Sequence, residues 1–136
     1  MIRKIKFQNK DQATFVRDLR KRVNRYFKEN NISKTANVHM VIKTISMFFI
    51  YLVPYGFVYS GLITGVSGLL IAIVMGIGMS GIGMSVMHDA NHGAYSSNPK
   101  VNKWVGICIY LIGGDVYNWK VQHNILHHTY TNIEGL

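Results

Sequence analysis

The stretch that decides the fold runs from Thr64 to Met87 and reads TGVSGLLIAIVMGIGMSGIGMSVM. It contains no charged side chain over 24 residues, and a helix that crosses a membrane needs about 20 consecutive apolar residues. Pairs of small residues four apart, such as Gly76 and Ser80, or Gly81 and Ser85, would let a second helix approach closely. We therefore predict a transmembrane helix over residues 64–87.

A second apolar stretch precedes it, from residue 41 to residue 62. Only Lys43 is charged there, Pro54 is expected to kink the helix, and three tyrosines lie toward its far end, where interfacial tyrosines are common. The connection between the two predicted spans, near residues 60–64, is short and uncharged. The spans should therefore form a tight helical hairpin.

The positive charge of the chain is concentrated before this hairpin. The formal net charge is +9; residues 1–43 contain 12 Lys or Arg and 3 Asp or Glu, whereas residues 44–136 contain 3 of each kind. A basic segment suits nucleic acid or an anionic membrane surface, and the apolar spans favour the membrane, so no nucleic-acid partner is expected. The positive-inside rule then places the N-terminus and residue 88 in the cytosol and Gly61 outside.

Residues 10–29, within the predicted cytosolic segment 1–40, have the pattern of an amphipathic helix. Phe15, Leu19 and Val23 recur every four residues, and basic side chains occupy most of the remaining surface. Such a helix either packs its apolar stripe on its own protein or lies on the cytosolic membrane surface. The sequence leaves both interpretations open.

Residues 101–114 are apolar but too few to span a membrane as a helix, which favours a re-entrant or interfacial segment. If this segment does not cross the membrane, residues 88–92 and 115–136 lie on one membrane face.

The chain has a single cysteine, Cys108, which excludes an intrachain disulfide and a cysteine-based metal site. We expect it to pack as a small apolar side chain.

Five of the six histidines form two clusters, HDANH at residues 88–92 and HNILHH at residues 123–128. A spacing of four places two imidazoles on one helical face, as needed for a shared metal centre. All-imidazole donation suits iron, copper, zinc or nickel, and five ligands suggest two metals or one metal of high coordination. A redox metal beside apolar helices points to dioxygen chemistry on a hydrocarbon. The predicted ligands are His88, His92, His123, His127 and His128.

The context of both clusters resembles a known family. HDANHGAYS at residues 88–96 resembles the first histidine box of the membrane fatty acid desaturases, and NWKVQHNILHHTYTN at residues 118–132 resembles their second box. The similarity is greatest to bacterial acyl-CoA or acyl-lipid desaturases of the linoleoyl-CoA, front-end type. It implies an all-α integral membrane protein of the bacterial inner membrane, with a basic amphipathic helix, a transmembrane hairpin, a re-entrant or interfacial helix and histidine-box helices on the cytosolic face.

The resemblance also implies an activity. In the family, two irons held by histidines use dioxygen as co-substrate to place a cis double bond in an acyl chain carried by coenzyme A or a lipid. Electrons arrive from a cytochrome or ferredoxin with its reductase. No catalytic residue beyond the metal site is expected. The candidates for orienting the imidazoles or lining the acyl tunnel, each of which could equally be an ordinary polar or interfacial residue, are Asp89, Asn91, Asp115, Trp119 and Gln122.

Desaturases carry a third histidine box far downstream, and the sequence here ends at Leu136. We therefore expect residues 1–136 to be the N-terminal part of a desaturase domain, with an incomplete iron site and no activity by itself. Membrane hydroxylases and ketolases use similar boxes, so they are an alternative. A non-catalytic membrane metal binder is another.

Overall fold

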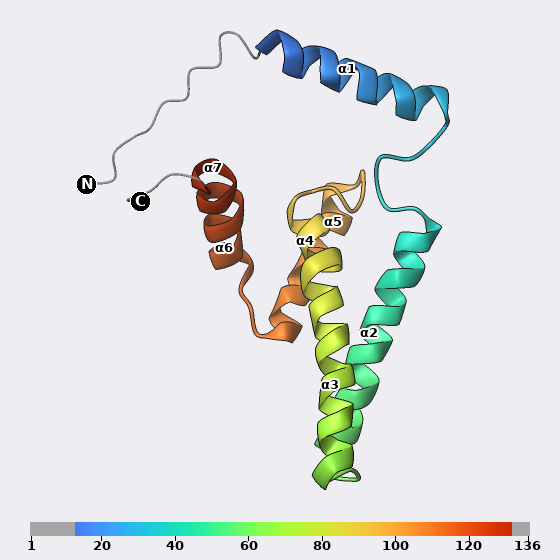
Figure 1. Cartoon of the computed structure of the whole chain (residues 1–136), viewed down its shortest axis with the longest axis vertical. Coiled ribbons are helices and arrows are strands. Elements are labelled where there is room, and N and C mark those ends of the chain that lie inside the picture. Colours follow the sequence, from blue (N-terminus) through green and yellow to red (C-terminus); the bar gives the residue numbers. More distant parts are fainter. Residues whose placement is uncertain (1–12, 132–136) are drawn as a thin grey trace, which may run out of the picture. The chain divides into compact units, whose positions relative to one another are not determined.

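A computed structural model describes residues 13–131 of the chain (Figure 1). These residues form helices and connections, and no β-strand occurs among them. They belong to two compact units, residues 13–34 and residues 35–131. The predicted all-α class is therefore confirmed for the described part of the chain.

The first unit consists of helix α1, Ala13–Glu29, and the turn that ends it. Asn31 adopts a left-handed conformation with φ of +52°, and the Ile32 N–H donates to the carbonyl of Phe27 at 3.0 Å. This hydrogen bond, from the residue after the left-handed one to a carbonyl five positions earlier, is the mark of a Schellman turn, which satisfies a free carbonyl and stops the helix. The predicted helix started at residue 10, and residues 10–12 lie outside the described residues.

The second unit is built on a helical hairpin of α2, Val38–Tyr59, and α3, Gly65–Gly81 (Figure 1). Helix α3 continues through the π-helical segment η1, Ile82–Met87, into the short helix α4, His88–Asn91. The two helical runs, Val38–Tyr59 and Gly65–Asn91, are long and apolar enough to cross a membrane. The second run carries the first histidine cluster at its end.

Glycine allows the two arms of the hairpin to touch. A Cβ atom added to Gly78 would lie 2.6 Å from the backbone nitrogen of Tyr51, and one added to Gly81 would collide with the Met47 side chain. By contrast, a Cβ atom on Gly76 would meet open space. Of the small residues predicted to allow a close approach, Gly81 makes one and Gly76 does not within the described residues, because the face of α3 that meets α2 carries Gly78 and Gly81.

The predicted short apolar segment forms helix α5, Pro99–Gly106, followed by the 3-10 helix η2, Ile107–Ile112. It packs on the hairpin, since Cys108 and Ile109 are buried in one core cluster with residues of η1. The Tyr51 hydroxyl donates to the carbonyl of Leu111 at 2.7 Å, which fastens η2 to α2. The expected packing of Cys108 as a buried apolar side chain is confirmed.

The second histidine cluster lies on a further helical run made of three short pieces. These are α6, Val116–Trp119, the π-helical η3, Lys120–His127, and α7, His128–Tyr130. Asp115 begins the run, because its Oδ1 accepts a hydrogen bond from the Asn118 N–H at 2.8 Å. No residue of these three pieces is buried.

Candidate metal centre

The first histidine pair is held by a helix end embedded in the core. His88 and His92 project from α4 and the turn after it, with ring centroids 4.5 Å apart. Asn91 between them is buried, and its Nδ2 donates to the carbonyl of Gly106 at 3.2 Å. A Cβ atom on Gly106 would lie 2.7 Å from the Asn91 Oδ1, so glycine is needed for this contact. Helix α5 therefore fixes the backbone that carries the pair.

Asn102 braces the loop that follows His92. Its buried side chain accepts a hydrogen bond from the Ser96 N–H at 2.7 Å and donates to the carbonyls of Ser96 at 2.7 Å and Gly93 at 3.1 Å. Three hydrogen bonds from one amide replace the backbone pairing that an irregular loop lacks. Sequence reasoning missed this residue, which lies between Lys100 and Lys103 and has no distinctive local pattern.

The two boxes meet in space. One ring nitrogen from each of His88, His92 and His123 lies within 4.8 Å of the others, and the Nε2 atoms of His88 and His123 are 3.2 Å apart. His88 and His123 are 35 positions apart in the sequence. The packing of α5 and η2 on the hairpin brings the two boxes together. The geometry is that of a three-imidazole cluster open to further ligands.

The remaining two predicted ligands adjoin this cluster. The ring of His128 lies 4.9 Å from that of His92 and 4.8 Å from that of His123. His127 is more peripheral, because its ring touches those of His123 at 5.1 Å and His128 at 5.4 Å. All five predicted ligands are therefore gathered in one place.

These side chains fit a metal ion. Imidazole nitrogens bind a divalent ion at about 2.1 Å, so two nitrogens on one ion lie about 3 Å apart. The 3.2 Å between the Nε2 atoms of His88 and His123 matches this spacing. Neutral imidazoles suit iron, copper, zinc and nickel equally, so the ligands alone do not select the metal.

Asp89 lies beside one of the predicted ligands. Its Oδ1 lies 3.1 Å from the Nδ1 of His88. A carboxylate at this position can accept a hydrogen bond from Nδ1–H, which keeps the proton on Nδ1 and leaves the lone pair on Nε2, the nitrogen that faces His123. Asp89 thus occupies the place predicted for a residue that orients an imidazole.

Trp119 packs directly on the cluster. Its ring stacks on that of His123 at 4.4 Å and meets those of His88 and His92 edge-on at 5.7 and 5.4 Å. The indole covers three imidazoles on one side and restricts the approach of water from that side.

The other predicted neighbours of the ligands take different places. Asn91 makes its side-chain hydrogen bond with Gly106, as described above, and its backbone carbonyl accepts one from Asn124 of the second box. Asp115 caps α6 and accepts a second hydrogen bond from the Tyr110 hydroxyl at 3.1 Å. Gln122 is exposed and makes no hydrogen bond within the described residues.

Asn124 joins the two boxes and was not predicted. Its Nδ2 donates to the carbonyl of Asn91 at 3.4 Å, across 33 positions of sequence. The Oδ1 of the same side chain is buried and has no hydrogen-bond partner among the described residues. This contact is the one direct hydrogen bond, apart from those of the imidazoles, that links the second box to the first in the described part of the chain.

The surroundings of His92 and His123 favour the neutral form of these two imidazoles. The pKa of His92 is lowered, first by loss of hydration and then by the nearby His88 and His128, while Asp89 opposes this shift. The pKa of His123 is also lowered, first by loss of hydration and then by the neighbouring histidines of both boxes. Because a metal binds the unprotonated ring, these shifts favour metal binding at neutral pH.

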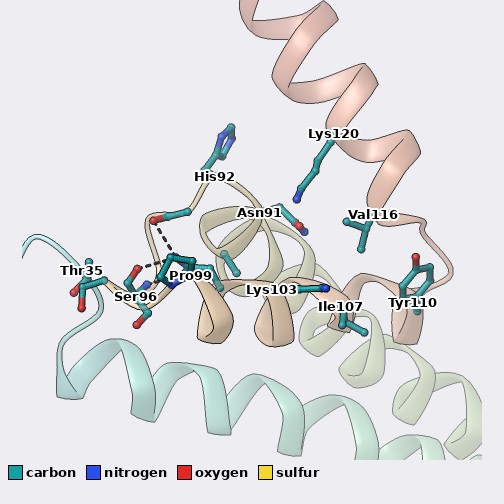
Figure 2. Close-up of a pocket in the computed structure, with 14 residues that line it drawn as sticks. Thr35, Asn91, His92, Ser96, Pro99, Lys103, Ile107, Tyr110, Val116 and Lys120 are labelled. Atoms are coloured by element: carbon teal, nitrogen blue, oxygen red, sulfur yellow. Dashed lines mark hydrogen bonds between the residues drawn. The ribbon is translucent and has the colours of Figure 1, made fainter.

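A cavity of about 820 Å³ opens beside the cluster. His92 lies at its edge, and Lys103 of α5 and Lys120 of η3 extend into it (Figure 2). None of the described residues that line it is a carboxylate. A cavity of this size is typical of a small-molecule site, and it lies next to a predicted metal ligand.

Comparison with known proteins identifies the family. The sequence model for "Fatty acid desaturase" matches residues 64–136, which include both histidine clusters. The chain belongs to the fatty acid desaturase family. No solved structure matches it.

Several curated desaturases resemble the chain. An sn-1 linoleoyl-lipid 6-desaturase of Arthrospira platensis is 41% identical over 121 residues, which cover 89% of this chain and 33% of that protein. The sn-1 linoleoyl-lipid 6-desaturase of Synechocystis is 37% identical over 97% of this chain and 36% of its own length. A probable Delta(5) fatty acid desaturase of Dictyostelium discoideum is 34% identical over 92% of this chain and 28% of its own length. The desaturase-family chain therefore spans about a third of the length of these relatives.

Proposed function

We propose that this chain supplies part of the iron centre of a membrane fatty acyl desaturase. The observation that carries the proposal is the convergence of His88, His92 and His123, with ring nitrogens within 4.8 Å, at the end of a long apolar helix. His127 and His128 adjoin this cluster and complete the proposed ligand set of the chain. Membership of the desaturase family favours iron over the other metals that imidazole accepts.

The residues of the chain prepare the site for acyl oxidation. When bound, a pair of irons supplies the redox chemistry by which dioxygen, two electrons and two protons remove two hydrogens from neighbouring methylenes and leave water and a double bond. Asp89 orients the His88 imidazole for metal binding, because its carboxylate accepts a hydrogen bond from Nδ1–H and leaves Nε2 free to bind the metal. Trp119 shields the imidazoles from water, and no side chain of the chain is needed as a general acid or nucleophile.

The substrate and electron donor follow from the relatives. Two relatives are named sn-1 linoleoyl-lipid 6-desaturases, so we propose an acyl chain esterified to a lipid as the substrate, with acyl-CoA as the alternative carrier. We propose a separate ferredoxin or cytochrome, with its reductase, as the electron donor. Regioselectivity depends on the depth of an acyl tunnel, for which Asp115 and Trp119 remain candidate lining residues.

We also propose a membrane orientation. The hairpin crosses the bilayer twice, with its basic N-terminal side and both histidine boxes in the cytosol, because the turn near residues 60–64 is uncharged. Single cysteines at Ser97 and Leu62, both exposed, test this in a Cys108→Ala background. A membrane-impermeant thiol reagent added outside intact cells should label position 62 and leave position 97 unlabelled; the reverse pattern would overturn the orientation.

The activity is tested by acyl analysis. The protein encoded by the complete reading frame that contains these residues, and residues 1–136 alone, are expressed in a bacterial host with a ferredoxin and its reductase. Gas chromatography with mass spectrometry of the fatty acid methyl esters should show a new double bond for the complete protein. His92→Ala should abolish it, and iron should be lost from the purified variant.

Other outcomes distinguish the alternatives. A hydroxylated product in place of the double bond would assign the chain to a related membrane hydroxylase. Bound metal with no acyl product in the presence of a working electron donor would favour a non-catalytic metal binder. A double bond that persists in His92→Ala would refute the proposed role of the cluster.

A further inference from the structure

Helix α1 presents a continuous apolar stripe that none of the described residues of its own unit buries. At 100° per residue, six apolar side chains fall within an arc of about 120°. Phe15 is 68% exposed and Tyr26 is 57% exposed, and no residue of the helix is buried. The stripe consists of Phe15, Val16, Leu19, Val23, Tyr26 and Phe27.

The basic residues of α1 are placed around this stripe in two groups. Arg20 and Arg22 border it, one on each side, within about 20° of its edges on the same helical projection. The other four basic residues occupy the opposite half of the helix, where Arg17 pairs with Asp18 at 4.0 Å in an exposed position. The four are Arg17, Lys21, Arg25 and Lys28.

Arginines that flank an apolar stripe are suited to a membrane surface. Their aliphatic stems extend along the apolar face while the guanidinium groups reach the phosphates of the lipids. A nucleic acid would contact only the charged half and leave the stripe in water, so this placement favours a surface that is apolar and anionic at once.

The end of α1 limits how far the helix can move from the hairpin. The Schellman turn at Asn31 stops the helix, and Lys34 Nζ donates to Asn24 Oδ1 at 2.6 Å, which draws the next residues back along it. Helix α2 begins at Val38, seven residues after Asn31, and seven residues reach at most about 25 Å. If α2 enters the bilayer, as the proposed function requires, α1 remains within reach of the bilayer surface.

We propose that α1 binds along the surface of a bilayer that contains anionic phospholipid. The stripe lies among the upper parts of the acyl chains, and Arg20 and Arg22 contact the lipid phosphates. This inference rests on the membrane insertion in the proposed function, and it adds the class of lipid and the residues that recognise it.

The test compares the two faces of α1 in the membrane-inserted protein. In a Cys108→Ala background, Leu19→Cys or Arg25→Cys carries an environment-sensitive nitrobenzoxadiazole label, and the protein is reconstituted in vesicles of phosphatidylcholine with or without phosphatidylglycerol. The label at position 19 should be blue-shifted and quenched slowly by aqueous dithionite when phosphatidylglycerol is present. The label at position 25 should be quenched rapidly in both vesicles.

Charge variants distinguish direct contacts between two arginines and the lipid phosphates from the general attraction of a basic helix to an anionic surface. Arg20→Gln/Arg22→Gln and Lys21→Gln/Arg25→Gln remove the same charge from different faces. Since a basic residue at an anionic surface contributes about fivefold to binding, the first pair should weaken protection of the label at position 19 by about 25-fold, and the second pair by less. Equal loss in the two pairs would overturn the assignment of Arg20 and Arg22 as phosphate contacts.

Two further results would overturn the proposal. Equal quenching at positions 19 and 25 in anionic vesicles would show that the stripe does not enter the bilayer. Protection at position 19 that does not depend on phosphatidylglycerol would show that protein or neutral lipid covers the stripe. Labelling at Ser97 and Leu62 reports insertion of the hairpin separately, so failure at α1 is distinguishable from failure of the proposed membrane topology.

Discussion

The two histidine boxes are held in different ways. The first follows a helix whose last turns are buried, with Val86, Met87 and Ala90 in the core and Asn91 hydrogen-bonded to Gly106. The second lies on a run with no buried residue. Its contacts with the first box are made mainly by the imidazoles themselves, by Trp119 and by Asn124.

This difference indicates which box depends on the metal. Packing against the hairpin positions the first box, so its ligands are arranged before a metal binds. The second box has little apolar contact of its own, and a metal bridging the two boxes would supply much of the free energy that keeps it in place. Site assembly should therefore proceed from the first box to the second.

The largest effect is expected from His88, which touches both boxes. His88→Ala should lower metal affinity by more than about 100-fold, since loss of a ligand exceeds the effect of losing a residue that orients one. His127→Ala should lower metal affinity less than His88→Ala does, because the His127 ring contacts only rings of its own box within the described residues. Metal titration of purified protein measures both, and equal losses would contradict the central place of His88.

The free energy of unfolding should distinguish the two side chains that hold the boxes in place, Asn102 beside the first box and Asn124 in the second. Asn102→Ala removes three hydrogen bonds of a buried amide and should lower the free energy of unfolding by about 3 kcal/mol. Asn124→Ala removes one hydrogen bond of 3.4 Å and should cost about 1 kcal/mol or less, because its Oδ1 is already unpaired. Denaturant unfolding in detergent, followed by circular dichroism, compares them. A larger cost for Asn124→Ala would show that the second box is the more tightly built.

Substitution of Asp89 tests whether the His88 imidazole is oriented by a hydrogen bond as well as by the packing of the first box. Asp89→Asn keeps the size of the side chain but removes the charge that holds the Nδ1 proton of His88, so metal affinity should fall about tenfold. Gln122→Ala is the control, because Gln122 is exposed and unbonded within the described residues. Equal affinities for the two variants would leave packing alone as the source of the arrangement.

Removal of the metal should loosen the second box selectively. After chelation, hydrogen exchange of the backbone amides should accelerate by about tenfold in residues 116–131, where metal contributes to local stability. Residues 82–91 should change little, because they are held by the core. Equal acceleration in the two segments would contradict the comparison.

Much of this arrangement could be predicted from the sequence because it depends on local patterns. The uncharged run after Thr64 indicated the hairpin, the spacing of four indicated the paired imidazoles, and the short segment 101–114 indicated that the chain turns back. The contacts at Gly78 and the hydrogen bonds of Asn102 could not be predicted, because they depend on which faces meet after residues distant in sequence come together. The partner of Asn124 lies 33 positions away and has no local signal.

The contact between Asn91 and Gly106 also constrains how the protein can evolve. A Cβ atom at position 106 would lie 2.7 Å from the Oδ1 of Asn91, and a residue at position 91 that has no side-chain donor would leave the carbonyl of Gly106 without the hydrogen bond from Asn91. Neither site can change freely while the other is kept. Substitutions at these two positions should therefore arise as correlated pairs in descendants of this chain, although neither residue carries out chemistry.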